Sequence, residues 1–209
     1  LEGAAADVRE RGWAWCALRL TLSRGAGPRG YAPPPVTRPR VIISAVALDR
    51  DGSMLQPAAT LTQASIRWGS QPALAGIKHL NRLEQVLAAA QYRAEGVDEA
   101  LMLDQSGRPV SVSAGNLFVV KQGKLVTPPL RDCGIAGTRR QLVLQCWAPA
   151  LSLSAVEAEL ALSDIEAAEE VFYSNSLLGL RPVAEFRGRQ WSRHEVCEAL
   201  HQLYRKEIA

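Results

Sequence analysis

Cysteine and histidine are scarce in this chain, and neither is clustered. Four cysteines and three histidines are scattered over 209 residues, with no C-x-x-C pair and no spacing typical of a metal site. We therefore expect no bound metal, and we expect the cysteines to be free thiols that pack as small hydrophobic side chains. These cysteines are Cys16, Cys133, Cys146 and Cys197.

Long apolar runs and blocks of one charge are also missing. No stretch reaches the run of about 18 apolar residues that a membrane-spanning helix needs, and the N-terminus lacks the pattern of a signal peptide. The 24 basic and 21 acidic residues are interspersed, so no segment is suited to grip nucleic acid or a membrane surface. We expect a cytoplasmic protein that acts on a small molecule.

The composition is that of a folded protein. Hydrophobic residues make up 47% of the chain, which is long enough for one large domain or two small ones. Residues 41–48 and 59–68 read as strands and residues 193–204 as an amphipathic helix, so the chain contains elements of both kinds. The chain begins Leu-Glu-Gly rather than with Met, so we expect a fragment or a processed product.

A lysine, Lys78, lies in the segment of residues 74–86, where an apolar approach leads into it. Residues 73–77 precede it without a charge, so desolvation would favour a neutral amine suited to Schiff-base chemistry. Leu80, Leu83 and Val86 recur at helical spacing, which predicts a helix from His79 that leaves the lysine on its first turn. The alternative is an ordinary solvated surface lysine.

A second segment, residues 23–31, holds three glycines and one proline. Such a composition predicts a tight loop in which the backbone can approach a ligand. Arg24, Arg29 and Tyr31 give this loop an anion-binding character, although a solvated hairpin turn explains the composition equally well.

A third segment is the glycine-containing turn 134–137, which leads into a helix predicted from Thr138 to about Cys146. Free N–H groups and the helix dipole make such a junction a phosphate site, and the alternative is a plain helix start. A strand predicted over residues 171–174 runs into Asn175 and Ser176, which otherwise form only a polar strand end.

The segment Gly76-Ile77-Lys78-His79-Leu80-Asn81-Arg82-Leu83-Glu84-Gln85-Val86 resembles the lysine segment of the 4-amino-4-deoxychorismate lyases. These are fold-type-IV pyridoxal-phosphate enzymes, relatives of the branched-chain and D-amino acid aminotransferases. The loop S-R-G-x-G-x-R-G-Y and the turn G-I-x-G-x-x-R-Q match the same family in the same order. The resemblance implies an α/β protein with mixed sheets. It divides the chain into a remnant of a small N-terminal α/β domain over residues 1–70, a link over 71–77 and a larger cofactor-binding domain over 78–209. It also implies a homodimer.

The resemblance implies that Lys78 carries pyridoxal 5'-phosphate and serves as the catalytic base. It assigns substrate binding to Arg29 and Tyr31, with Arg24 structural. The implied reaction converts 4-amino-4-deoxychorismate to 4-aminobenzoate and pyruvate in folate biosynthesis. Two alternatives stay open: a fold-type-IV aminotransferase for D- or branched-chain amino acids, and a catalytically silent relative that serves as a binding subunit. The cofactor phosphate would be held by the backbone amides of Thr138 and Arg139, with the Thr138 hydroxyl adding a hydrogen bond, and by Asn175 and Ser176.

The sequence departs from the family in two places. Family members carry a glutamate against the pyridine nitrogen, five residues before the Asn of an N-L-F motif; here that motif begins at Asn116 and the position holds Ser111. A serine would contact the cofactor without keeping its nitrogen protonated, so the ring would be a weaker electron sink, which a lyase tolerates better than a transaminase. About the first third of the family's chain, with a phosphate-binding arginine and a threonine near the substrate, precedes what is Leu1 here.

Overall fold

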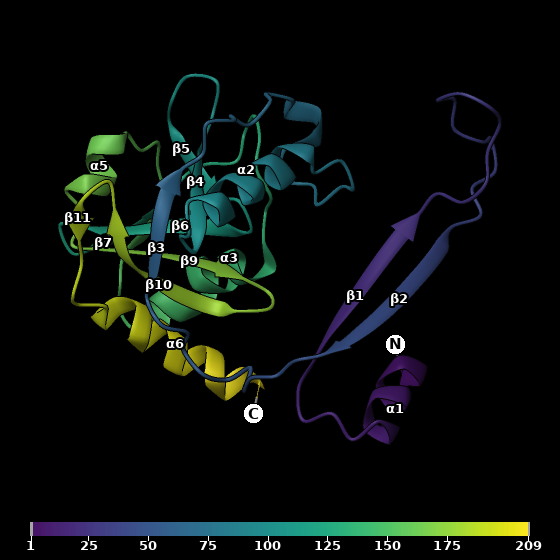
Figure 1. The fold of residues 1–209 in the computed structure, drawn as a ribbon, viewed down its shortest axis with the longest axis horizontal. Helices are drawn as coiled ribbons and strands as arrows, with labels where there is room; N and C mark the ends of the chain where they lie inside the picture. Colours follow the sequence, from purple (N-terminus) through teal and green to yellow (C-terminus); the bar gives the residue numbers. More distant parts are fainter. Residues whose placement is uncertain (1, 209) are drawn as a thin grey trace. The chain divides into compact units, whose positions relative to one another are not determined.

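The computed structural model describes residues 2–208 and divides the chain into two compact units, Leu1–Gly52 and Ser53–Ala209 (Figure 1). This division differs from the domain boundary that we expected at residues 71–77. The reason is the strand β3 (Ala59–Gln63), which pairs with β10 (Gly179–Phe186) on one side and with β4 (Glu99–Leu103) on the other. It therefore belongs to the nine-stranded sheet of the second unit. A local pattern predicts a strand but not the sheet that it joins.

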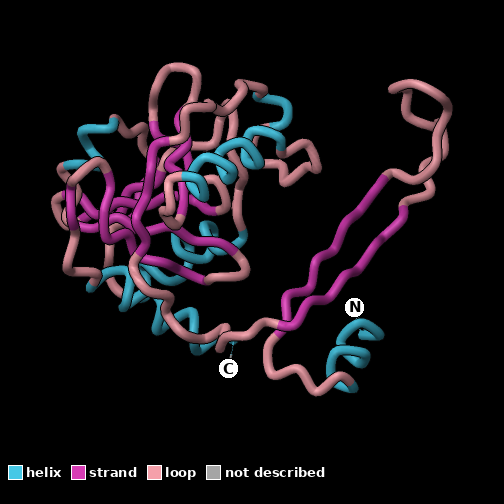
Figure 2. The backbone as a smooth tube through the Cα atoms, in the orientation of Figure 1, coloured by secondary structure: helices cyan, strands magenta, loops and turns pink. Residues whose placement is uncertain are grey.

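The first unit contains one helix and a two-stranded sheet. The helix α1 (Glu2–Glu10) precedes the antiparallel strands β1 (Cys16–Ser23) and β2 (Arg40–Ala47), which pair without interruption from Cys16 with Ala47 to Ser23 with Arg40. Figure 2 shows this pair as a long ribbon that ends in the loop rich in glycine and proline. At Gly25 the backbone has a φ of +91°, and an added Cβ would lie 2.0 Å from the carbonyl oxygen of Arg38, so only glycine fits.

The second unit contains a nine-stranded mixed sheet whose pairings close on themselves. The closed path runs β10, β3, β4, β5, β6, β9 and back to β10, with parallel pairs at β10–β3 and β3–β4. This confirms the mixed α/β fold expected from the sequence. The further strands of the path are β4 (Glu99–Leu103), β5 (Pro109–Val112), β6 (Gly115–Lys121), β9 (Glu170–Asn175) and β10 (Gly179–Phe186); β7 (Lys124–Thr127), β8 (Ala155–Glu157) and β11 (Arg189–Gln190) extend it.

Both faces of these strands are buried, because each face packs against its own apolar cluster. Leu117 and Tyr173 belong to one cluster, whereas their neighbours Phe118 and Phe172 stack at 5.0 Å in another. This is the alternation that a strand imposes on successive side chains. A third cluster surrounds Trp68 and lies under the helix α2 (Leu83–Ala94). All four cysteines are free thiols, as expected.

The helix α2 begins later than the sequence predicts. Its first residue is Leu83 and its N-cap is Arg82, so Lys78 lies in the segment before the helix and not on its first turn. The large apolar side chains Leu83, Val86 and Leu87 are exposed, and Ala88 provides the buried contact with the sheet. The helical spacing was therefore predicted correctly, but the expected start was wrong, and the largest apolar side chains do not enter this unit's core.

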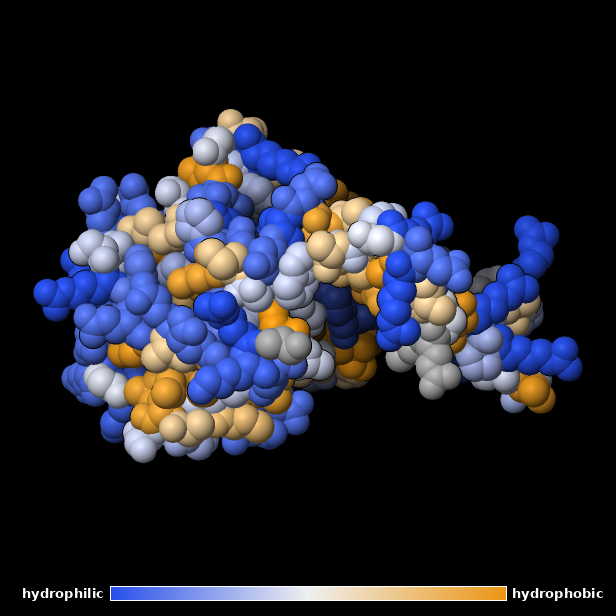
Figure 3. Space-filling model, turned by 90° about the horizontal axis from the view of Figure 1, so that it is seen from below, coloured by the Kyte–Doolittle hydropathy of each residue, from blue (hydrophilic) through white to orange (hydrophobic). Residues whose placement is uncertain are grey.

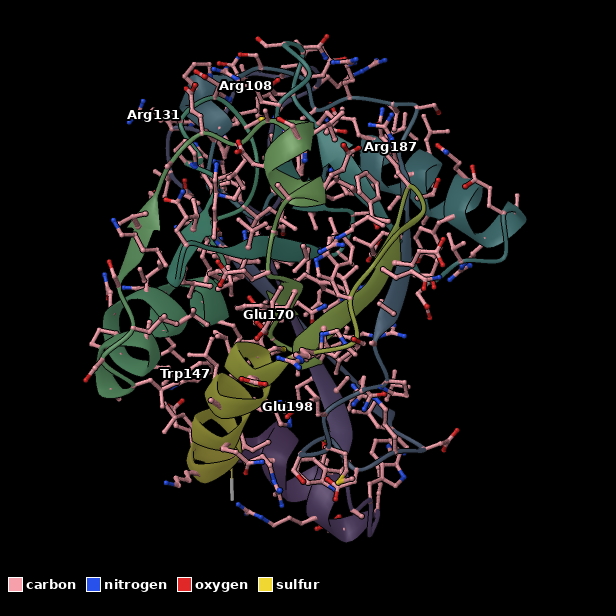
Figure 4. All side chains as sticks on the ribbon, turned by 90° about the vertical axis from the view of Figure 1, so that its left-hand side faces the viewer. Arg108, Arg131, Trp147, Glu170, Arg187 and Glu198 are labelled. Carbon is pink, nitrogen blue, oxygen red and sulfur yellow. The ribbon has the colours of Figure 1, made fainter. Side chains whose placement is uncertain are left out.

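The other helices lie on the sheet or follow it. A short helix η1 (Pro72–Leu74) precedes the lysine segment, and α3 (Thr138–Leu142), η2 (Val143–Trp147) and α4 (Ala148–Ala150) follow one another without a break. The helix α5 (Leu162–Glu166) comes before β9, and the C-terminal helix is α6 (Glu195–Ile208). Figure 4 shows Glu170 near the first turn of α6, where its carboxylate accepts hydrogen bonds from the backbone N–H groups of Val196 (2.9 Å) and Cys197 (3.2 Å).

The surface mixes polar and apolar side chains. Figure 3 shows the two kinds interspersed over the face of the larger unit that it presents. Among the residues that the structure describes, no helix has the length and apolar character needed to cross a membrane.

Candidate functional site

The lysine segment and the glycine-containing turn, which are far apart in the sequence, lie side by side. The N–H of Gly76 donates to the carbonyl oxygen of Gly134 (3.0 Å), and the N–H of Ala136 donates to that of Gly76 (2.9 Å). These bonds form a parallel bridge between Gly76 and Ile135. Lys78 therefore lies two residues after Gly76, whose backbone is hydrogen-bonded to the predicted phosphate turn.

Arg82 braces the backbone on both sides of Lys78. Its Nη2 donates to the carbonyl oxygen of Ile77 (2.7 Å) and its Nε to that of His79 (2.9 Å). Its guanidinium also lies 5.8 Å from the ring centre of Trp68. Partial burial desolvates this cation and lowers the pKa of Arg82 below its ordinary value. We did not predict this residue from the sequence, where it reads only as a charge at a helix start.

Lys78 itself is exposed in this chain. The apolar residues before it do not enclose its ammonium group, since Ile77 and Leu74 are about half exposed themselves. The desolvation expected for this amine stays a prediction. What the structure provides instead is a lysine on a braced backbone that a ligand can reach.

The start of α3 packs against the sheet at a position where only glycine fits. Gly137 is the N-cap of α3, and a Cβ added to it would lie 2.2 Å from Oδ1 of Asn116. The same Asn116 donates through Nδ2 to the carbonyl oxygen of Ile135 (2.7 Å). Asn116 thus holds the turn in place, a role that the N-L-F motif could have indicated but that we did not assign.

Thr138 and Ser176, two of the predicted phosphate ligands, lie together. Their hydroxyl oxygens are 3.3 Å apart, although 38 residues separate them in the sequence. Arg139 does not direct its side chain to the same place. Its guanidinium lies 4.8 Å from the ring centre of Tyr204 and 3.7 Å from a carboxylate oxygen of Glu207, both on α6. The phosphate role predicted for Arg139 belongs to its backbone N–H, which this position of the side chain does not affect, and that role stays a prediction.

The side chain of Asn175 already has protein partners. Its Oδ1 accepts from the N–H groups of Leu177 (2.9 Å) and Leu178 (2.7 Å), and its Nδ2 donates to the carbonyl oxygen of Ala114 (2.9 Å). This arrangement shapes the turn that presents Ser176. A ligand role for Asn175 stays a prediction, whereas its structural role follows from these three bonds.

A row of polar side chains crosses the sheet beneath this turn. Ser111 on β5 pairs with Asn116 on β6, and Asn116 pairs with Ser174 on β9, so all three share one face. Their exposed fractions are 4%, 7% and 0%. At the two ends of the row, the apolar residue Met102 pairs with Ser111 and the apolar residue Leu180 pairs with Ser174. The hydroxyl of Ser174 has no hydrogen-bond partner among the described residues.

Ser111 has a partner in the adjoining cluster. Nε1 of Trp68 donates to its hydroxyl oxygen at 3.0 Å, and both residues are buried. Across the described range 2–208, no group of histidine, cysteine or carboxylate side chains could hold a metal ion. The chemistry of this site rests on hydroxyls, backbone N–H groups and one lysine.

Arg29 and Tyr31 lie in the first unit. Both are exposed in the loop between β1 and β2. Arg24 and Tyr31 line a shallow hollow together with Gly27 and Pro28. Arg24, which we assigned a structural role, therefore contributes to the surface of this loop.

The larger unit has the donor set that a phosphorylated cofactor requires. Thr138 and Ser176 supply two hydroxyls next to a helix start, and Gly137 allows the close approach of the backbone. The unpartnered hydroxyl of Ser174 and the reachable Lys78 add further polar groups. The residues present therefore fit such a group.

Comparison with known proteins places the chain in a family. Residues 2–186 match the sequence model described as amino-transferase class IV, so the chain belongs to that family. Its members depend on pyridoxal phosphate, the cofactor expected from the sequence.

Lyases and aminotransferases both occur among the similar proteins. The chain is 38% identical over 168 residues to the aminodeoxychorismate lyase of Vibrio harveyi, covering 80% of this chain and 62% of that protein. It is 32% identical over 193 residues to a putative branched-chain-amino-acid aminotransferase of Methanocaldococcus jannaschii, covering 90% of this chain and 65% of that one. The chain thus spans less than two thirds of the length of these curated relatives.

Solved structures give the same picture. The crystal structure of 4-amino-4-deoxychorismate lyase from Pseudomonas aeruginosa superposes with a TM-score of 0.84 at 37% identity, covering 91% of this chain and 71% of that one. A branched-chain aminotransferase from Thermoproteus uzoniensis reaches a TM-score of 0.86 at 24% identity, covering 99% and 69%, which supports the fold alone.

Proposed function

We propose that this chain is the larger part of a pyridoxal-phosphate lyase that converts 4-amino-4-deoxychorismate to 4-aminobenzoate and pyruvate, a step of folate biosynthesis. The observation that carries this proposal is the backbone bridge between Gly76 and Ile135, which joins the segment of Lys78 to the glycine-containing turn before Thr138. An enzyme of this class requires a reactive amine close to a turn that binds the cofactor phosphate.

Each residue of the site has a proposed task. The hydroxyls of Thr138 and Ser176 and the backbone N–H groups at the start of α3 bind the cofactor phosphate. Bound pyridoxal phosphate supplies an electron-withdrawing ring that stabilises negative charge on the carbon next to the substrate nitrogen. The amine of Lys78 would hold the cofactor and would be freed when the substrate amine takes its place. It would then remove the proton from that carbon and return a proton to the departing pyruvate fragment.

The glycine-containing loop of the first unit is proposed to bind the substrate. The guanidinium of Arg29 would form charge-assisted hydrogen bonds with a substrate carboxylate, and the ring of Tyr31 would orient the substrate. The S-R-G-x-G-x-R-G-Y pattern of this loop favours the lyase over an aminotransferase. Ser111 favours it as well, because a weaker electron sink suits an elimination that forms an aromatic ring.

The second candidate is an aminotransferase for D- or branched-chain amino acids, favoured by the relatives that carry those names. Product analysis separates the two candidates. The chain loaded with pyridoxal phosphate should release pyruvate from 4-amino-4-deoxychorismate without an added amino acceptor, and the variant K78A should not. Turnover that requires a 2-oxo acid would identify an aminotransferase. A chain that binds no cofactor and turns over neither substrate would be a silent relative.

We also propose that the protein works as a cytoplasmic homodimer. Support for the dimer comes from exposed apolar side chains next to the site, since such patches mark interaction surfaces. They are Leu80, Leu83, Val86 and Leu87, each about half to three quarters exposed.

A further inference from the structure

Trp68 and Ser111 form a buried pair in which the direction of the hydrogen bond is fixed. An indole N–H can only donate, so the hydroxyl oxygen of Ser111 is the acceptor of this 3.0 Å bond. The hydroxyl proton of Ser111 must then point to a different group. Within residues 2–208, the structure gives Ser111 no side-chain or backbone acceptor for that proton, although the residue is only 4% exposed.

The position of Ser111 in the site indicates which group could accept that proton. Thr138 and Ser176 mark the phosphate end of the polar row, and Asn116 lies between that end and Ser111. Ser111 is two strands away from Ser174, which is about 10 Å at ordinary strand spacing. A flat aromatic cofactor whose phosphate is bound near Thr138 would reach along this row with its ring toward Ser111.

We infer that Trp68 is a positioning residue that orients the Ser111 hydroxyl as a donor to the cofactor's ring nitrogen, so that this nitrogen is bound unprotonated. This inference rests on the proposed function, because it requires pyridoxal phosphate on the polar row. A neutral pyridine nitrogen is an acceptor and satisfies the remaining proton of Ser111. A protonated ring nitrogen is a donor, so it would leave that buried proton without an acceptor.

The neighbourhood of Ser111 is consistent with a neutral ring nitrogen. Trp68 packs with Ala64, Ala88 and Met102, so apolar groups surround the indole of the pair. The guanidinium of Arg82 lies 5.8 Å from the centre of the indole ring, and a positive charge disfavours a second cation nearby. The carboxylate of Glu84, which accepts a hydrogen bond from the N–H of Gly69 at 2.8 Å, acts in the opposite sense. The apolar packing and the guanidinium lower the tendency of a bound pyridine to take up a proton.

Nuclear magnetic resonance of pyridoxal phosphate labelled with ¹⁵N in the ring tests the inference. Bound to the wild-type chain, the ring nitrogen should resonate at the position of a neutral pyridine and keep that position between pH 6 and pH 8. The variant S111E, which restores a carboxylate, should move the resonance to that of a pyridinium ion. The variant W68F, which deletes the indole N–H and keeps an aromatic ring, should shift the resonance part of the way and make it depend on pH.

The matched control is W191F. Trp191 also donates its buried indole N–H, to the carbonyl oxygen of Ala168 at 2.9 Å, but it belongs to the cluster on the other face of the strands. Its replacement should leave the resonance unchanged. A pyridinium resonance in the wild-type chain, or equal shifts in W68F and W191F, would overturn the inference while leaving the proposed function intact. Absence of any bound cofactor signal would overturn the proposed function and the inference together. If S111E does not fold, the wild-type and W68F spectra decide.

Discussion

Glu99 is a buried carboxyl group that the proposed site does not use. It is 4% exposed, and its Oε1 accepts hydrogen bonds from the hydroxyl of Ser113 and from the N–H of Ala100. Desolvation by burial raises the pKa of Glu99 above its ordinary value of 4.5, and the hydrogen bonds only partly oppose that shift. The folded protein therefore holds this proton more tightly than the unfolded chain does.

This shift predicts a pH dependence of stability. As pH rises from about 4.5 through the raised pKa, the unfolded chain loses its proton first, so the contribution of Glu99 to stability falls across that window. The variant E99Q keeps an oxygen that can accept from Ser113 but cannot ionise. Urea unfolding of both proteins at pH 4.5, 6 and 8 should show the free energy of unfolding of the wild type falling relative to E99Q. A constant difference between the two would contradict the assignment.

The motif residues could be predicted from the sequence, but several of their supporting residues could not. Lys78, Thr138 and Ser176 stand out because a lysine in an apolar segment and polar residues at chain turns have recognisable patterns. Arg82 acts through hydrogen bonds to the carbonyl oxygens of Ile77 and His79, and Ser174 lies in its site through its pairing with Asn116 on the next strand. Neither role has a recognisable sequence pattern, because it depends on how the chain is folded around the residue.

At the scale of the element, the segment that carries Lys78 depends on one side chain. The variant R82M removes both hydrogen bonds from Arg82 to the carbonyl oxygens of Ile77 and His79 while keeping a long side chain. Because the segment then loses its brace, we expect pyridoxal phosphate to bind about tenfold more weakly, the effect of losing about 1.4 kcal/mol. A spectrophotometric titration of the apo chain measures this affinity.

The control for that titration is R93M, which changes an exposed arginine near the end of the same helix. It should bind the cofactor as the wild type does. If R82M also binds with wild-type affinity, the brace has no part in forming the site.

The helix α6 depends on a cap from another element. Glu170, on β9, accepts hydrogen bonds from the backbone N–H groups of Val196 and Cys197 at the start of the helix. A negative charge at this position also complements the positive end of the helix dipole. The variant E170Q should lower the free energy of unfolding by about 1–2 kcal/mol. Chemical denaturation measures this, with the exposed neighbour Glu169 changed to Gln as control. Equal stability of the two variants would show that the cap is unimportant.

The elements themselves could be largely predicted from the sequence, and their ends could not. The strand predicted over residues 171–174 lies within β9 (Glu170–Asn175), since the polar residues Asn175 and Ser176 at its end are a local signal. The start of α2 was placed four residues early, because the spacing of Leu80 with Leu83 continues the helical pattern. Arg82 ends that pattern through contacts with backbone carbonyls, which no spacing rule contains.

At the scale of the whole molecule, the exposed apolar residues near the site predict association. If the patch of Leu80, Leu83, Val86 and Leu87 forms the proposed dimer interface, the wild-type chain of 22.7 kDa should have twice that mass in solution. The variant V86E should shift it to the monomer, since a buried unpaired charge is costly. Light scattering after size exclusion measures the mass.

The control for the dimer is V156E, which places the same charge on β8, where Val156 is also partly exposed. It should leave the mass unchanged. A monomeric wild-type chain would contradict the proposed interface.

The domain organisation shows the limit of local patterns. The mixed α/β class followed from the family resemblance, whereas the boundary expected at residues 71–77 differs from the division at Gly52 and Ser53. The strand β3 looks the same in sequence whichever sheet it joins. Its parallel pairing with β10, more than 100 residues later, decides its place and is not visible locally.

The account depends most on Lys78 as the point of cofactor attachment. The chain has four lysines, Lys78, Lys121, Lys124 and Lys206, so intact mass after incubation with pyridoxal phosphate and borohydride reduction, followed by peptide mapping, identifies the modified one. We expect one added cofactor mass on the peptide of Lys78, none in K78A, and full labelling in the control K206A. An unlabelled wild-type chain, or a K78A variant that is still labelled once, would contradict the central claim.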